Sequence, residues 1–284
     1  MSDKLKNLLV RTLSGAVLFA VVLGASVGPY TYALLLFFIA TVGMWEYYKI
    51  AAQCGCRPQL AVGMVAGVVL FVSSFFLFEG VARGGVPDMD MALGGFVYLV
   101  LLIALSFVVE LFKPSEHPLR NIAATLLGVW YVALPMSLML FVPLMLSSNE
   151  GWNGWYFLFF LFLVWGNDVF AYLVGISMGK HRMCERISPK KSWEGFVGGV
   201  LGSLAMGALG AWVLDGSYLV WIGLAAVVSI SSVLGDLVES MFKREAGIKD
   251  SGNIIPGHGG ILDRFDALLL AAPMAFVYLV VLLF

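Results

Sequence analysis

Charge is scarce in this chain of 284 residues, because Asp, Glu, Lys and Arg together make up only 12% of it. A soluble domain carries about 25% charged residues and about 45–50% apolar ones, whereas this chain is 61% hydrophobic. Cysteine is also scarce. The 3 cysteines cannot form a disulfide framework, and Cys54 and Cys56 lack the spacing and the second pair of a zinc site. The composition excludes a soluble enzyme and a disulfide-stapled domain, and it indicates a membrane protein.

Long apolar runs recur along the whole chain. A membrane-spanning helix needs about 20 mostly apolar residues. Such windows lie near residues 8–28, 30–48, 58–79, 92–113, 120–146, 155–177, 193–214, 218–242 and 264–284. The sequence therefore predicts an all-α polytopic membrane protein with about nine transmembrane helices. The basic start and first apolar run also resemble a signal peptide, but no good cleavage site follows, so we expect the first helix to remain as an anchor.

The basic residues predict the orientation in the membrane. Of the 17 Lys and Arg residues, all except Arg83 fall on one side of the predicted spans. By the positive-inside rule, the N-terminus is cytoplasmic and the C-terminus, after nine spans, lies outside. We expect the inner (cytoplasmic) membrane as the location, with any site built from the basic loops facing the cytoplasm.

Chemistry is concentrated in the second half of the chain. Residues 1–150 are expected to form chemically quiet transmembrane helices, and residues 151–284 a catalytic region with cytoplasmic loops 178–192 and 243–263. In the first half, Glu46 stands out near the end of the second span. It either caps the cytoplasmic end of that span or belongs to a distant part of the site, and the sequence favours the cap.

Several acids lie inside predicted spans, where an ionisable side chain costs about 2.5–3.5 kcal/mol and usually marks function. Asp168 lies in the sixth span, Asp236 and Glu239 lie in the eighth, and Asp263 and Asp266 open the ninth. Residues three apart share a helix face, so two helices are expected to direct carboxylates towards one point. Oxygen ligands of this kind favour Mg²⁺. Pairing of the acids with nearby Lys and Arg at the helix ends is the alternative.

Phosphate-binding chemistry surrounds these acids. Glycines allow positive φ and close backbone approach, so the turn around Gly257, Gly259 and Gly260 could form an anion-binding nest. His258 is a ligand, a phosphate contact or a simple loop donor. Basic side chains that suit phosphate oxygens are Lys243, Arg244, Lys249 and Arg264. Topological anchoring would explain these cations equally well.

The loop between the sixth and seventh spans is also basic. Its segment Ser188–Ser192 places Lys190 and Lys191 before a predicted helix, and helix N-termini favour anions. Ser192 is suited to cap that helix, with Glu194 in its first turn. A solvated basic loop is the alternative explanation.

Residues 240–266 resemble the signature of the phosphatidate cytidylyltransferase (CDP-diacylglycerol synthase) family. The matching positions are Ser240, Lys243, Arg244, Lys249, Asp250, Gly252, Pro256, His258, Gly259, Gly260, Asp263, Arg264 and Asp266. The upstream segments Asn167-Asp168, Gly179-Lys180 and 188–195 are similar to the family too. The resemblance covers about the last 120 residues.

This resemblance implies an enzyme that converts CTP and phosphatidic acid to CDP-diacylglycerol and pyrophosphate, with Mg²⁺ required and a monovalent cation such as K⁺ as a second ion. It also implies a homodimer in the lipid bilayer, and no nucleic-acid partner is expected. The expected catalytic residues are Asp236, Asp263, Lys243 and Arg264. The expected substrate-binding residues are Ser188, Lys190, Lys191, Arg244, Lys249, His258, Gly259 and Gly260. The expected metal ligands are Asp236 and Asp263, with Asp168, Asp250 and Asp266 as second-rank candidates.

Two other functions fit part of the pattern. A cation-coupled transporter would use the intramembrane acids as ion sites, but it gives no reason for the dense basic and glycine-rich loops, and the chain has no evident internal repeat. A CTP-using lipid kinase would share the phosphate chemistry and would transfer only the γ-phosphate.

Overall fold

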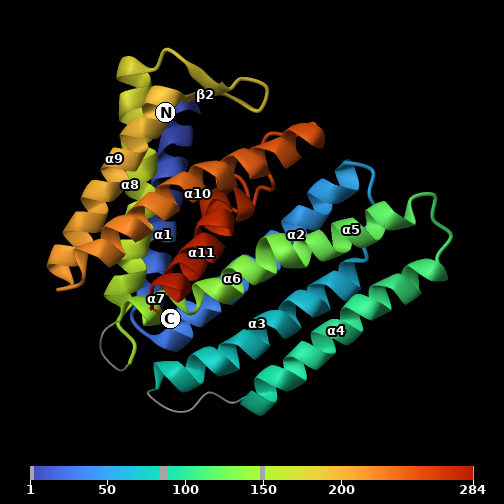
Figure 1. The fold of residues 1–284 in the computed structure, drawn as a ribbon. Helices are drawn as coiled ribbons and strands as arrows, with labels where there is room; N and C mark the ends of the chain where they lie inside the picture. The colour runs from blue at the N-terminus through green and yellow to red at the C-terminus, as the bar shows by residue number, and fades with distance from the viewer. Residues whose placement is uncertain (1–2, 84–88, 148–150, 284) are drawn as a thin grey trace. The chain divides into compact units, whose positions relative to one another are not determined.

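The computed structural model describes residues 3–83, 89–147 and 151–283 (Figure 1). Within these residues, 9 helices are long and apolar enough to cross a membrane. The prediction of an all-α polytopic membrane protein with nine spans is therefore confirmed. Helices suit this environment because every backbone polar group is satisfied within the helix.

The elements follow the predicted spans closely. The first four spans are α1 (Asp3–Ser26), α2 (Pro29–Gln53), α3 (Leu60–Ala82) and α4 (Met89–Leu111). The fifth consists of α5 (Pro118–Gly128), η1 (Val129–Ala133), α6 (Leu134–Met139) and α7 (Val142–Leu146). The remaining elements are α8 (Gly154–Met178), β1 (Arg182–Cys184), β2 (Ser188–Ser192), α9 (Trp193–Val213), α10 (Tyr218–Glu245) and α11 (Leu262–Leu283).

The fifth span is not the single helix that its apolar run predicts. It contains a π-helical turn, η1, followed by two short helices. Pro135 and Pro143 lie at the first turns of α6 and α7. Proline has no N–H to donate and clashes with the preceding turn, so the regular hydrogen-bond ladder is interrupted near each of them.

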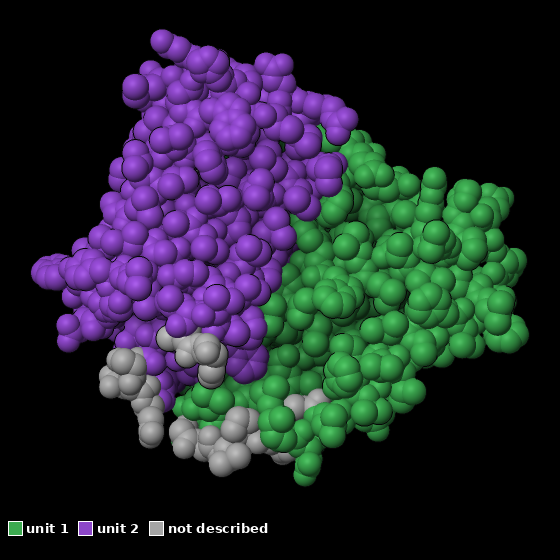
Figure 2. Space-filling view, viewed as in Figure 1, with its two compact units in different colours: residues 1–140, 242–265 green, residues 141–241, 266–284 purple. Residues whose placement is uncertain are grey.

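The described residues form two compact units, coloured separately in Figure 2. Unit 1 comprises residues 1–140 and 242–265, and unit 2 comprises residues 141–241 and 266–284. The predicted loop 243–263 thus packs with the N-terminal helices, although the sequence groups it with the C-terminal half.

In unit 1, α2 supplies much of the core, and α3 lies beside α4 (Figure 1). Tyr48 on α2 donates a 2.8 Å hydrogen bond to the carbonyl of Thr125. A buried polar group ties α4 to its neighbours, because Glu110 accepts hydrogen bonds from Gln59 at 2.9 Å and Asn121 at 2.6 Å. These bonds satisfy polar groups that would otherwise be costly in an apolar environment.

In unit 2, α8 and α9 lie side by side (Figure 1). Glycines on α9 permit this close approach. A Cβ on Gly198 would lie 2.5 Å from Val174 of α8, and one on Gly202 would clash with Phe170. Small residues at helix contacts let backbones approach closely, which is how membrane helices gain packing energy.

A short antiparallel hairpin, β1–β2, precedes α9, and the sequence did not predict it. Arg182 pairs with Ser192, and Cys184 pairs with Ser188. The expected cap is confirmed, since the Ser192 hydroxyl accepts a 3.2 Å hydrogen bond from the N–H of Gly195. The loop after α8 is therefore an ordered structure with a fixed helix start.

Candidate active site

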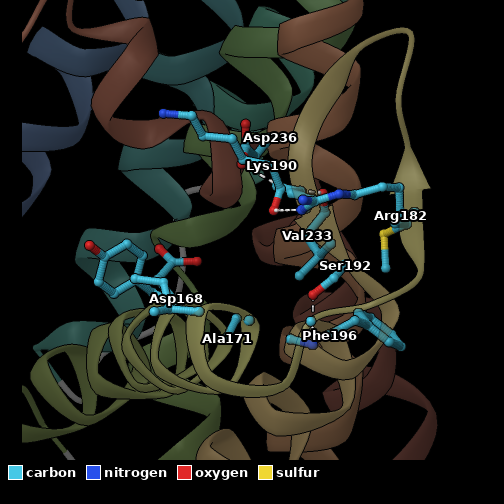
Figure 3. Close-up of a pocket in the computed structure, with 15 residues that line it drawn as sticks. Asp168, Ala171, Arg182, Lys190, Ser192, Phe196, Val233 and Asp236 are labelled. Carbon is cyan, nitrogen blue, oxygen red and sulfur yellow. Dashed lines mark hydrogen bonds and ion pairs between the residues drawn. The ribbon is translucent and has the colours of Figure 1, made fainter.

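A cavity of about 660 Å³ lies within unit 2 (Figure 3). Helices α8 and α10, the hairpin and the start of α9 supply its walls. The residues that line it are Asp168, Ala171, Tyr172, Gly175, Ile176, Gly179, Arg182, Met183, Lys190, Lys191, Ser192, Gly195, Phe196, Val233 and Asp236. The lining combines three basic and two acidic side chains with apolar ones. Such a cavity suits a molecule that carries both charge and apolar groups.

Lys191 and Asp236 meet in this cavity. Lys191 Nζ lies 2.5 Å from Asp236 Oδ2 and also donates to the carbonyl of Val233 at 3.4 Å. The Ser240 hydroxyl donates to Asp236 Oδ1 at 3.2 Å. The side chains of Lys191 and Asp236 are 24% and 38% exposed, so an incoming ligand can reach them. Lys191 and Asp236, two site residues predicted from the sequence, are 45 positions apart in the chain and form one ion pair in the structure.

Three further charged side chains face the same cavity. Asp168 projects from α8, and Lys190 lies on β2 (Figure 3). Arg182 crosses the hairpin and donates to the carbonyl of Lys190 at 3.4 Å. Sequence reasoning named Asp168 and Lys190 but missed Arg182. The signal that could have found it was its position in the same short basic loop as Lys190.

Glu194 fixes the hairpin to the start of α9. Its carboxylate lies 2.6 Å from His181 Nδ1 and accepts from the backbone N–H of Lys180 at 3.1 Å. The N–H of Trp193 donates to the carbonyl of His181 at 2.9 Å. These contacts hold the basic strand at a defined position beside the cavity.

Asp236 is also part of an acidic cluster in unit 2. One carboxylate oxygen from each of Asp236, Glu239 and Asp266 lies within 4.8 Å of the others. Gly235 permits this arrangement, because a Cβ there would lie 2.7 Å from the carbonyl oxygen of Asp266 on α11. The expected pairing of acids from two helices is therefore observed for these three residues. A set of hard oxygen donors fits Mg²⁺.

Asp263 is buried in unit 1 with its own partners. Lys243 Nζ lies 2.6 Å from Asp263 Oδ1, and the two side chains are 10% and 3% exposed. Oδ2 accepts from the backbone N–H groups of Ser251 at 2.9 Å and Gly260 at 2.8 Å. The structure thus brings together the predicted residues Lys243, Gly260 and Asp263. The charge of Asp263 is compensated within unit 1 by Lys243 and by two backbone N–H groups.

The glycine-rich turn has the backbone conformation that the sequence predicted. Gly257 and Gly259 have φ values of 74° and 91°. The N–H groups of His258 and Gly259 both donate to the carbonyl of Ile255, at 2.9 and 3.2 Å. The Gly260 N–H donates to Asp263, so the N–H groups of His258, Gly259 and Gly260 all donate to acceptors of the protein itself.

The first span also contacts the turn. Ser14 on α1 lies 2.8 Å from His258 Nδ1 and donates to the carbonyl of Pro256 at 2.9 Å. Arg11 donates to the carbonyl of Gly257 at 2.9 Å. His258 therefore has a hydrogen-bond partner on the N-terminal helix.

The expected role of Glu46 as a cap for the end of the second span is wrong. Glu46 is 1% exposed, and α2 continues for seven residues beyond it to Gln53. Its carboxylate accepts hydrogen bonds from Ser251 and from the N–H groups of Ile261 and Leu262. It belongs to the environment of the signature loop.

The other predicted residues lie at more open positions. Arg244 donates to the carbonyl of Ile248 at 3.0 Å. Lys249, Asp250 and Arg264 are exposed, and Ser188 is half-buried at the start of β2. Cys54, Cys56 and Cys184 are free thiols, and burial raises the pKa of the Cys54 thiol.

Comparison with known proteins assigns the family. The sequence model of the cytidylyltransferase family matches residues 9–282. The chain is 33% identical over 282 residues to a phosphatidate cytidylyltransferase of Synechocystis sp., with 90% of each chain covered. It is 33% identical over 280 residues to one of Haemophilus influenzae, covering 93% of this chain and 95% of the relative. It is 40% identical over 189 residues to one of Staphylococcus aureus, covering 65% of this chain and 70% of the relative.

Neither the family match nor these relatives support the transporter or the lipid-kinase alternative. The signature residues, the cavity with its basic hairpin and a match over nearly the whole length lead to one assignment. This chain belongs to the cytidylyltransferase family.

Proposed function

We propose that this chain is a membrane enzyme that joins CTP to phosphatidic acid, giving CDP-diacylglycerol and pyrophosphate. The observation that carries the proposal is the family match over residues 9–282, together with relatives of that activity at 33–40% identity. The amphiphilic cavity supports it, because a lipid phosphate presents a charged group attached to apolar chains.

The reaction needs positioning more than proton transfer. The phosphate monoester of phosphatidic acid is already anionic near neutral pH. One of its oxygens attacks the α-phosphorus of CTP in line, a new P–O bond forms, and the bond from the α-phosphorus to the β-phosphate oxygen breaks to release pyrophosphate. Catalysis of such transfers depends mainly on alignment and on stabilisation of phosphate charge.

Basic residues of this chain supply that stabilisation. Lys190, Lys191 and Arg182 line the cavity and are placed to bind phosphate oxygens. Arg can contact two oxygens at once, whereas Lys acts as a point charge. By resemblance, Lys243, Arg244, Lys249 and Arg264 serve the substrates as well, with Ser188, His258, Gly259 and Gly260 as further contacts.

Mg²⁺ is proposed as the cofactor, and the donor set of unit 2 fits it. Asp236, Glu239 and Asp266 would hold the ion, which when bound neutralises phosphate charge. The resemblance assigns Asp263 as a ligand beside Asp236. A carboxylate offers about four lone-pair sites. Because the Asp263 oxygens already accept three hydrogen bonds, about one site is left for a metal ion. K⁺ as a second ion and Asp168 and Asp250 as further ligands rest on the sequence.

The location follows from the substrates. Phosphatidic acid keeps its acyl chains in the bilayer, and CTP is dissolved in the cytosol. We therefore place the enzyme in the cytoplasmic membrane with its site open to the cytoplasm, in agreement with the distribution of Lys and Arg. A homodimer is proposed from the family resemblance alone.

The test is a reaction of detergent-purified protein with CTP, phosphatidic acid and Mg²⁺. Formation of CDP-lipid and pyrophosphate in equal amounts is the expected result. Labelled CTP gives the decisive comparison, because a lipid kinase would leave CDP in solution and move only the γ-phosphate. Purified protein that forms neither CDP-lipid nor pyrophosphate would overturn the proposal.

A further inference from the structure

The N-terminus of α11 lacks a cap from its own sequence. The residue before Leu262 is Ile261, whose side chain cannot accept a hydrogen bond. The first N–H groups of a helix have no partner within the helix and need an acceptor from elsewhere. At this helix the need is acute, because Ile261 and Leu262 are 4% and 2% exposed.

Glu46 on α2 supplies the missing acceptors. Its Oε1 accepts from the N–H of Ile261 at 3.1 Å, and its Oε2 accepts from the N–H of Leu262 at 2.7 Å. Oε2 also accepts from the hydroxyl of Ser251 at 3.1 Å. A carboxylate at a helix N-terminus is favoured by the helix dipole, so the buried charge is compensated there.

The same segment holds Asp263. The backbone N–H of Ser251 donates to Asp263, while its hydroxyl donates to Glu46. Along the chain, the N–H of Gly260 binds Asp263, and the next two N–H groups bind Glu46. The two carboxylates therefore share one short stretch of backbone. A shift of that stretch must move Asp263.

Two glycines fit around the Glu46 carboxylate. A Cβ on Gly260 would lie 2.5 Å from both oxygens of Glu46, and a Cβ on Gly252 would clash with Oε1. The loop backbone thus approaches the carboxylate so closely that only glycine fits. The carboxylate is enclosed by the loop and is not a solvated charge beside it.

We propose that Glu46 is a positioning residue for the reaction: it fixes the start of α11 and the 251–262 loop, and so sets the place of the Asp263 carboxylate and its Lys243 partner. Glu46 does not touch the reacting atoms. The inference rests on the proposed function for its kinetic consequence, but its structural part stands independently of it.

The experiment compares Glu46→Gln with a matched control, Glu110→Gln. Glu110 is likewise buried in unit 1 and accepts hydrogen bonds from Gln59 and Asn121. Both of these partners of Glu110 lie outside the 251–262 loop. The two substitutions remove the same charge from comparable surroundings, so a general loss of stability would affect both.

Amide hydrogen exchange of the purified proteins is the first measurement. In Glu46→Gln, exchange in the peptide that covers residues 251–262 is expected to accelerate at least about tenfold, as local opening becomes easier. The hairpin peptide covering residues 182–192 should keep its rate, and Glu110→Gln should leave both peptides unchanged. Loop exchange at the wild-type rate in Glu46→Gln would overturn the proposal.

Kinetics is the second measurement. A misplacement of about 1 Å can cost about 100-fold in rate, so Glu46→Gln is expected to lower kcat roughly 10- to 100-fold with KM for CTP changed less than about threefold. Faster loop exchange with wild-type kcat would also refute the positioning role. Absence of turnover in the wild-type protein would refute the proposed function. The structural role of Glu46 would still be tested by hydrogen exchange.

Ser251→Ala provides a second test of the same proposal if the Glu46→Gln protein fails to insert into the membrane. This change removes one hydrogen bond to Glu46 and leaves the N–H that binds Asp263. It should speed exchange in the 251–262 peptide and lower kcat by a smaller factor, about threefold to tenfold, as expected for one lost hydrogen bond. Unchanged exchange and kcat in Ser251→Ala would contradict the proposal.

Discussion

Removal of the Lys243 ammonium is predicted to destabilise the protein strongly. Lys243→Met keeps an apolar stem of the same length and removes the terminal ammonium, which leaves Asp263 as a buried charge without its cation. Breaking a buried ion pair by removing one partner typically costs about 3–5 kcal/mol. Because Asp263 retains its bonds from Ser251 and Gly260, we expect the lower end, about 3 kcal/mol.

Thermal unfolding in detergent measures this effect. At roughly 2–4 °C per kcal/mol for a chain of this size, the Tm should fall by about 6–12 °C. The control is Arg83→Met, which removes the cation of an ion pair with Glu79 whose Arg side chain is 65% exposed. An exposed pair contributes little, so its Tm should be nearly unchanged.

A double variant separates the buried charge from simple loss of packing. In Lys243→Met/Asp263→Asn the carboxamide oxygen still accepts from backbone N–H groups, and no charge is left unpaired. We expect this variant to regain at least about half of the lost Tm, since the penalty arises mainly from the uncompensated charge. A wild-type Tm in Lys243→Met, or a lower Tm in the double variant than in the single one, would refute the reasoning.

Four further predictions concern the cavity, the metal and the packing of unit 2. Asp236→Asn should abolish turnover while membrane insertion, measured by yield and thermal unfolding, persists; retained Mg²⁺-dependent turnover would contradict the metal assignment. Dialysis against EDTA should abolish activity, and Mg²⁺ should restore it, as measured by pyrophosphate release. Arg182→Ala should raise the KM for a phosphate substrate about tenfold or more with unchanged Tm, the loss of one charge-assisted contact. Gly198→Leu should reduce the folded yield, because its side chain would overlap Val174, whereas Gly94→Leu should be tolerated since nothing lies within 4 Å of its Cβ position.

The spans could be predicted from the sequence because the bilayer imposes one dominant requirement. A run of about 20 apolar residues has few alternatives to a helix, and nine such helices are present among the described residues. Breaks inside a span are less visible. The apolar run of the fifth span conceals a π-helical turn and two further helix starts. The β1–β2 hairpin was missed because its five-residue strand is polar, without the alternation that marks a half-buried strand.

The site residues were predictable by type and not by partner. Clustered acids and lysines indicated metal and phosphate chemistry, and the structure pairs Lys191 with Asp236 and Lys243 with Asp263. Helix spacing alone could not assign these pairs, because each pair joins two different elements. Lys191 on β2 pairs with Asp236 on α10, and Lys243 on α10 pairs with Asp263 on α11. Glu46 was misjudged for the same reason. Its partners lie 205–216 residues away, a separation at which a single sequence carries no signal.

The glycine-rich turn has a structural role that its sequence did not predict. Glycines at 257, 259 and 260 do allow positive φ and close approach of an anion, as a phosphate-binding nest requires. In the structure, however, the anions that the neighbouring N–H groups meet are the carboxylates of Asp263 and Glu46. A nest that is filled by the protein's own acids holds those acids in place. The turn therefore has a physical reason for its glycines that needs no substrate, and the phosphate contact expected at Gly259 and Gly260 stays a prediction. Exposed cations are also present in the unit 2 cavity, which Arg182 and Lys190 line.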